Sequence, residues 1–182
     1  AGSALAADGL AVHALVTTHL SAAAAMFSWI LLEYLKNGKP SLVGASTGLV
    51  AGLVAITPGA GFVSTWSAVI IGLLVSPVCF YAIAIVKHKL GYDDALDAFG
   101  CHGVGGIFGG IVTGLFTTPE LALDPDNIGL IYGNPRLFLV TIAAIVFTIV
   151  WSAGMTFVLM KGISFFMPLR VSDREEAIGL DN

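Results

Sequence analysis

Charged residues are missing from long stretches of this sequence, and the stretches have the lengths of membrane-spanning segments. No Asp, Glu, Lys or Arg occurs in residues 9–32, 40–86, 98–119 or 137–160. A helix needs about 20 mostly apolar residues to cross a bilayer. The second stretch is too long for one helix, and the turn-forming residues 57–61 (Thr-Pro-Gly-Ala-Gly) interrupt it. The pattern therefore predicts five spans, at 9–35, 41–57, 66–87, 95–117 and 137–166.

The continuity of these apolar stretches distinguishes between the two ways of crossing a membrane. Only α-helices and closed β-barrels satisfy every backbone polar group inside hydrocarbon. Barrel strands alternate polar and apolar residues, whereas the stretches here are apolar throughout. We therefore expect an all-α integral membrane protein with five transmembrane helices, of which the short, glycine-rich segment 41–57 is the least typical.

Composition agrees with the bilayer as the solvent. Of the 182 residues 57% are hydrophobic and only 11% are charged, against about 25% charged in an ordinary soluble domain. So few charges exclude a disordered chain and a typical soluble enzyme, and a net charge of −4 argues against nucleic-acid binding. Cys79 and Cys101 both lie in apolar stretches and form no metal-binding or disulfide pattern. We expect no metal and no cofactor.

Basic residues predict how the chain is oriented, because cytoplasmic loops are enriched in Lys and Arg. The second connection has none, and the fourth has Arg136 against three acidic residues. Lys161 lies just inside the last span, and the other six fall in the first and third connections and in the tail, at Lys36, Lys39, Lys87, Lys89, Arg170 and Arg174. We therefore expect the N-terminus outside and the C-terminus in the cytoplasm, in a plasma or inner membrane. The start Ala1-Gly2-Ser3, without an initiator Met, indicates part of a longer protein.

Two spans carry glycine at every fourth position. Small residues at this spacing let helix backbones approach closely in a membrane, where lipid supplies no hydrophobic drive between helices. We expect these residues to pack helices against one another. They are Gly44, Gly48 and Gly52 in the second span, and Gly106, Gly110 and Gly114 in the fourth.

Histidines are the candidate functional groups, because an ionisable residue inside a span is costly. His88 lies between two lysines and is expected to be solvated. His13 and His19 lie in the first span. For both, the interpretation we prefer is a structural one, a neutral ring that donates to a backbone carbonyl of a neighbouring helix.

His102 differs from the other histidines because glycines surround it. Gly106 and Gly109 share its helix face, which would leave the imidazole with little bulk beside it, as in a narrow lumen. A neutral imidazole can both accept and donate a hydrogen bond. Asp97 is expected to cap the start of this helix, and Asp93 or Asp94 could do the same.

Several segments, in order along the chain, resemble the ammonium transporter (Amt/Mep/Rh) superfamily, on its Amt side. Residues 97–107, DAFGCHGVGGI, are similar to its D-x-F-G-x-H-G-V-x-G-I segment. Residues 38–45 and 52–58, residues 148–152 and the tail's Gly179-Leu180-Asp181 resemble the same family. The resemblance covers nearly the whole chain and implies an ammonium transporter, not an enzyme.

The resemblance also implies an architecture. The chain would be the C-terminal half of an eleven-helix inverted-repeat transporter, covering helices 7 to 11. Residues 1–169 would then belong to the membrane domain and 170–182 to a cytoplasmic tail. The family implies a homotrimer in the bilayer and, in prokaryotes, a PII-type regulatory protein on the cytoplasmic face.

Site residues follow from the same resemblance. His102 matches the second of two pore histidines, and the first would lie on the other half of the transporter. Ser3 matches a serine that helps to bind ammonium in the external vestibule. One departure is Thr17-Thr18, where many relatives have Asn-Thr.

Two alternative functions are open at this stage. The first is an ammonium sensor on the same fold, which a signalling domain after Asn182 would reveal. The second is a haem-binding electron-transfer bundle, in which His13, His19 and His102 would supply axial ligands.

Overall fold

The computed structural model describes residues 1–179, and its regular elements are helices. Among these residues the only β pairing is an isolated bridge between Val63 and Thr117. The all-α prediction is confirmed. The chain forms two compact units, residues 1–142 and the residues from 143 onward, and each is described by itself. Of the segments that carry the family resemblance, Leu180 and Asp181 lie outside the described residues.

Four helical segments in residues 1–179 are long and apolar enough to cross a membrane. They start and end within about four residues of the predicted spans. These four segments are α1 (Gly9–Asn37), Thr65–Leu90 (α3 Thr65–Tyr81, the π-helix η2 Ala82–Val86 and α4 Lys87–Leu90), Phe99–Phe116 (the π-helix η3 Phe99–Gly103 and α5 Val104–Phe116) and α6 (Arg136–Ser164).

The span expected at 41–57 corresponds to α2 (Leu42–Ile56), which has only 15 residues and is shorter than the other four. The count of five spans therefore stays a prediction.

Side-chain caps fix where the first three helices begin. The side chains of Asp8, Ser41 and Ser64 each accept a hydrogen bond from the backbone N–H three residues later, at 3.0, 2.9 and 3.1 Å. Such caps satisfy backbone donors that have no partner within the helix. α1 ends at Asn37, and the next residue, Gly38, has a φ of 74°, a left-handed conformation that glycine adopts without strain.

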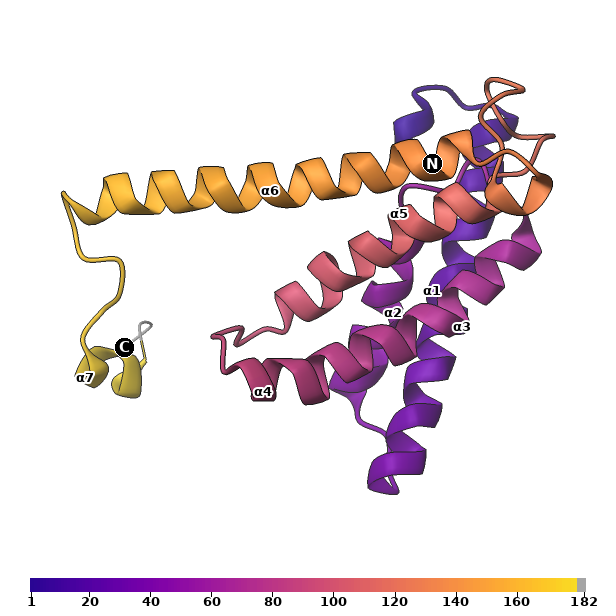
Figure 1. Cartoon of the computed structure of the whole chain (residues 1–182). Coiled ribbons are helices and arrows are strands. Elements are labelled where there is room, and N and C mark those ends of the chain that lie inside the picture. The colour runs from indigo at the N-terminus through magenta and orange to yellow at the C-terminus, as the bar shows by residue number, and fades with distance from the viewer. Residues whose placement is uncertain (180–182) are drawn as a thin grey trace. The chain divides into compact units, whose positions relative to one another are not determined.

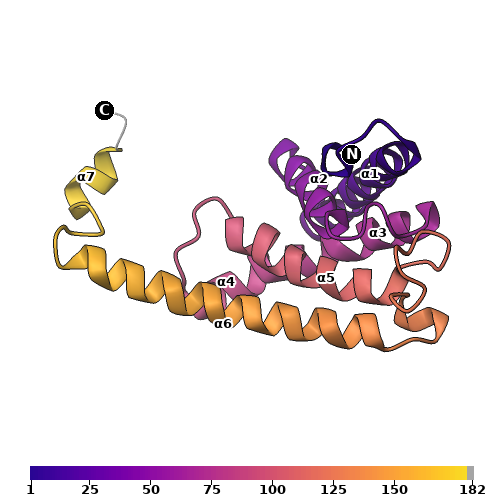
Figure 2. The same cartoon turned by 90° about the horizontal axis from the view of Figure 1, so that it is seen from above.

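The core of the first unit forms where α1 packs against α2 and α3 (Figures 1 and 2). Hydroxyl groups of α1 and α3 link the three helices. Ser21 Oγ donates to the Gly52 carbonyl at 3.0 Å, and Ser76 Oγ donates to the Ala25 carbonyl at 2.6 Å. Each bond of this kind contributes about 0.6 kcal/mol on average in membrane proteins, so that several together fix the helix pairing.

The glycines of α2 lie where this helix meets α1. All three are buried. A Cβ at Gly48 would overlap Trp29, and one at Gly52 would stand 2.6 Å from the Ser21 carbonyl. The geometry is that of the close approach expected from their four-residue spacing.

Gly44 makes room for a carboxylate. A Cβ at this position would overlap the carboxylate of Glu33 on α1. Glu33 accepts hydrogen bonds from the backbone N–H of Ser41 at 2.7 Å and from its hydroxyl at 3.1 Å. Glu33 thus ties the end of α1 to the start of α2.

The glycines of α5 divide between packed and open positions. Gly110 is buried, and a Cβ at Gly114 would stand 3.0 Å from Phe138 at the start of α6. A Cβ at Gly106 would have no atom within 4 Å. Within residues 1–142 the contacts of α5 with α2 and α3 lie instead at Gly105 and Gly109, one residue before the predicted positions.

The second unit holds most of α6 and the tail helix α7 (Asp173–Ile178). No residue of α6 is buried. Ser172 caps α7 in a reciprocal capping box with Glu175, and Arg170 pairs with Glu176 at 2.6 Å. Hydrogen bonds from the Ser172 hydroxyl and backbone N–H hold the pKa of Glu175 below its ordinary value.

Candidate functional site

His102 lies in a π-helical turn, not in a regular α-helix. The turn, η3, leads directly into α5. Single π-turns inside helices are rare and occur often at functional sites. Gly100 and Cys101 of this turn are buried, whereas the imidazole of His102 is exposed on the surface of the chain. Among residues 1–179 it has no hydrogen-bond partner, so that both ring nitrogens are available to a ligand or to another segment.

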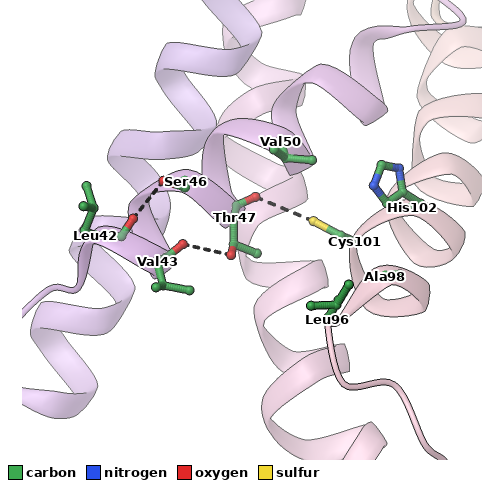
Figure 3. Close-up of a pocket in the computed structure, with 9 residues that line it drawn as sticks. All are labelled: Leu42, Val43, Ser46, Thr47, Val50, Leu96, Ala98, Cys101 and His102. Carbon is green, nitrogen blue, oxygen red and sulfur yellow. Dashed lines mark hydrogen bonds between the residues drawn. The ribbon is translucent and has the colours of Figure 1, made fainter. Parts of the chain in front are cut away.

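The imidazole borders a pocket of about 530 Å³ between η3 and the first half of α2 (Figure 3). Figure 3 shows Thr47 and Val50 of α2 across the pocket from Cys101 and His102. Most of the wall is apolar. The lining residues are Leu42, Val43, Ser46, Thr47, Val50, Leu96, Ala98, Cys101 and His102.

The hydroxyl and thiol groups of this wall already donate hydrogen bonds to backbone carbonyls. Ser46 and Thr47 donate to the carbonyls of Leu42 and Val43, each at 2.9 Å, and the Cys101 thiol donates weakly to the Thr47 carbonyl at 3.6 Å. Donors engaged in this way leave the imidazole as the group best able to exchange a proton or a hydrogen bond with a small solute.

The sequence predicts that Gly106 and Gly109 leave open space beside His102, and this holds for one of the two glycines. Gly106 opens to free space, as expected. Gly109 does not, because it packs on α2, where a Cβ would stand 2.6 Å from the Ala55 carbonyl. The π-turn changes the register of the helix, so that a face assigned from α-helical spacing no longer holds across it.

The cap of this helix is Asp94 and not Asp97. The Asp94 carboxylate accepts hydrogen bonds from the backbone N–H groups of Ala98, Phe99 and Gly100, at 2.8, 3.0 and 3.4 Å. Asp97 has a φ of 55°, and its side chain pairs with Lys87 at 2.7 Å. The left-handed residue bends the chain back, which brings the more distant carboxylate over the helix start. The helix therefore begins at Phe99, later than the predicted 95.

Ser3 lies at a second pocket. It belongs to a short 3₁₀ turn, η1 (Gly2–Ala4), and borders a cavity of about 400 Å³. Thr18 of α1 and Thr57 and Pro58 of the loop after α2 line the same cavity. Ser3 and His102 therefore lie at two separate pockets of the first unit.

His13 and His19 bond to backbone carbonyls. His13 Nε2 lies 2.8 Å from the Val63 carbonyl, and His19 Nδ1 lies 2.9 Å from the Leu15 carbonyl of its own helix. Because a carbonyl only accepts, each of these nitrogens carries the hydrogen. Each ring thus bonds a backbone carbonyl as expected, but neither carbonyl is on a neighbouring helix, because Val63 lies in the loop between α2 and α3 and Leu15 lies on the helix of His19 itself. Across residues 1–179 no three His, Cys, Asp or Glu side chains gather as a metal site.

The sequence pattern does not predict the roles of two residues that organise the two pockets. Thr17, noted only as a departure from relatives, is fully buried and donates to the Ala60 carbonyl at 2.6 Å. The sequence predicts Lys87 only as a basic residue of a cytoplasmic connection, yet Lys87 contacts the segment before His102. The close spacing of Lys87, Asp94 and Asp97 along the chain was the available signal for the second of these.

Comparisons with known proteins give consistent results along the whole chain. The sequence model of the Ammonium Transporter Family matches residues 1–182. An ammonium transporter of Bacillus subtilis is 49% identical over 180 residues, which cover 99% of this chain and 44% of the relative.

Two solved structures also match nearly the whole chain. The crystal structure of Saccharomyces cerevisiae Mep2 matches 95% of this chain and 40% of its own, with a TM-score of 0.88 and 34% identity. A structure named Sensor Amt Protein matches 98% of this chain and 43% of its own, with a TM-score of 0.87 and 27% identity. The chain therefore spans less than half the length of these proteins.

Proposed function

Because the chain belongs to the ammonium transporter family, we propose that it forms the C-terminal part of a transporter that takes up ammonium through an apolar pore beside His102. Membrane-length apolar helices support a location in the bilayer. The boundary at residue 169, between a membrane domain and a tail, belongs to the same proposal.

The observation that carries this proposal is the setting of His102. An exposed imidazole with free nitrogens borders a mostly apolar pocket, on a helix that has open space at Gly106. Ammonium and potassium are similar in size and charge, so that a pore cannot separate them by diameter alone. An apolar lumen imposes a large desolvation cost on any ion that keeps its charge. Ammonium avoids that cost by giving up a proton, and potassium has none to give.

His102 has the chemistry that this step needs. A neutral imidazole can take the proton from ammonium as the ion loses its water, which leaves ammonia to cross and an imidazolium that returns the proton to water at the exposed side of the ring. At the other pocket Ser3 would accept a hydrogen bond from ammonium before it enters. We propose further that the other half of the transporter supplies the second wall of the lumen. The proposal also includes a homotrimeric assembly and a PII-type regulatory partner on the cytoplasmic face.

Reconstitution tests the function directly. The full-length protein in proteoliposomes should take up isotope-labelled ammonium down its gradient, with no comparable uptake of potassium. Uptake no faster than in empty liposomes would contradict the proposal. Ammonium binding without uptake would instead favour a sensor, the function named for one structural neighbour. The family membership favours transport over a haem-binding bundle, and a Soret band in the purified protein would reverse that preference.

Topology gives a second prediction. We expect single cysteines at Asn37 and Leu123, in the first and fourth connections, to react with an impermeant thiol reagent from opposite faces of sealed vesicles. Leu123 is 84% exposed and Asn37 is exposed at the end of α1. The native Cys79 and Cys101 are buried and should react little. Labelling of both positions from the same face would contradict the five-span topology with the N-terminus outside.

A further inference from the structure

We infer that Lys87 is a positioning residue that sets the orientation of His102, an inference that rests on the proposed transport function. Lys87 is the first residue of α4, directly after the π-helix η2. Its ammonium group donates to the Asp97 carboxylate at 2.7 Å and to the Asp94 carbonyl at 2.5 Å. The lysine therefore joins the end of one predicted span to the residues that begin the next.

Both acceptors of Lys87 control the turn that carries His102. Asp97 has a φ of 55°, a left-handed conformation that is uncommon outside glycine, and its carbonyl accepts the hydrogen bond of Cys101 N–H at 2.9 Å. Asp94 holds three backbone N–H groups at the start of η3 through its carboxylate. A strained residue keeps its conformation only where its surroundings hold it. Here the Lys87 ammonium holds its side chain.

The π-turn makes the direction of the imidazole sensitive to this support. A π-turn contains one residue more than an α-turn. If η3 relaxed to α-helical geometry, residues on its two sides would rotate relative to one another by about 100°, the angle per residue of an α-helix. His102 lies within this turn. Loss of the support would therefore turn the ring with respect to the pocket.

A second contact joins the same two segments beside Lys87. η2 packs against η3, and a Cβ at Gly100 would overlap the side chain of Ile83. Glycine at position 100 thus lets the two π-turns touch. Lys87 follows η2, which ends at Val86, and its contacts with Asp94 and Asp97 reach the segment just before η3. The distribution of basic residues predicts that this end of the two turns lies at the cytoplasmic side.

Neighbouring cations have other surroundings. Lys36 Nζ lies over the rings of Phe80 and Tyr81, at 5.2 and 4.6 Å from their centroids. Lys89 is exposed, and within the described part of the chain it makes no hydrogen bond or ion pair. Lys89 is therefore a matched control, since it has the same charge and lies on the same short helix.

The experiment compares Lys87→Met, Lys87→Arg and Lys89→Met in the full-length protein in proteoliposomes. Ammonium uptake and potassium leak are normalised to the amount of folded transporter, and thermal stability is measured in parallel. We expect Lys87→Met to lower ammonium uptake per folded molecule on the order of ten-fold, and to lower the ratio of ammonium to potassium. Lys87→Arg should restore much of both, and Lys89→Met should match the parent.

Asp97→Asn extends the test if Lys87→Met folds poorly. Asparagine tolerates the left-handed conformation but removes the charge, so that it should reproduce the Lys87→Met defect and add little to it in the double variant. The inference would be overturned if Lys87→Met and Asp97→Asn both kept parental selectivity per folded molecule. It would also be overturned if the loss of uptake in these variants were explained by their lower thermal stability alone. The parent and His102→Ala are run beside them. A parent that does not transport, or a fully active His102→Ala, would refute the proposed function instead.

Discussion

His102→Ala is expected to abolish most ammonium uptake while leaving the fold nearly intact. The imidazole is exposed, borders a pocket and makes no hydrogen bond within residues 1–179, so that its removal should change stability by no more than about 0.5 kcal/mol. A hydrogen bond to a charged group is worth about 1.5–3 kcal/mol. Its loss at the point where ammonium sheds water would slow transport roughly ten-fold to a hundred-fold. Isotope uptake in proteoliposomes measures the rate.

Two further variants give this experiment its controls. His88→Ala removes an exposed histidine from α4 and should transport at the parental rate. His102→Glu offers a carboxylate that can still relay a proton but also attracts cations, so that potassium leak should rise. If His102→Ala kept parental rate and selectivity, the imidazole would have no role in the pore.

The ends of the long helices were predictable because residues next to each end determine where the helix stops or starts. Asp8 and Gly38 bracket α1, and charged residues end each apolar stretch. A cap or a left-handed glycine acts within one turn, so that the neighbouring sequence contains the whole signal. The start of the helix that carries His102 was less predictable. Three aspartates compete there, and the outcome depends on Asp97 taking a positive φ and on Lys87, ten residues earlier, pairing with it.

The motif identifies His102 as the candidate pore histidine, whereas the geometry around this residue could not be predicted from the sequence. Nothing in the sequence around His102 distinguishes a π-turn from an α-turn, and the difference moves every face assignment on α5. The glycines show the consequence. Spacing alone treats Gly106 like Gly48, yet the first opens to free space and the second contacts α1. Periodicity identifies small residues on one face, but the neighbouring helix decides which face is packed.

Gly48→Leu should impair assembly of the transporter more than any other single substitution proposed here. Gly48 is buried where α2 meets α1, and even a Cβ would overlap Trp29. Relief would have to come from separation of the helices, because the Ala25 carbonyl, 3.1 Å from the same position, is backbone and cannot rotate away. Overpacking of this kind costs about 1–3 kcal/mol, and the hydrogen bonds between α1 and its neighbours would weaken as well. We expect a lower yield of folded protein and a lower melting temperature.

Gly154→Leu is the matched control for that substitution. It makes the same change in another apolar helix, and a Cβ at Gly154 would have no atom within 4 Å. Melting temperature and size-exclusion profile in detergent should remain parental for Gly154→Leu and change for Gly48→Leu, and Gly48→Ala should fall between them. Equal stability of Gly48→Leu and the parent would mean that α1 and α2 do not meet at this glycine. The hydroxyl bond from Ser21 to the Gly52 carbonyl, one helical turn further along, would then be unsupported too.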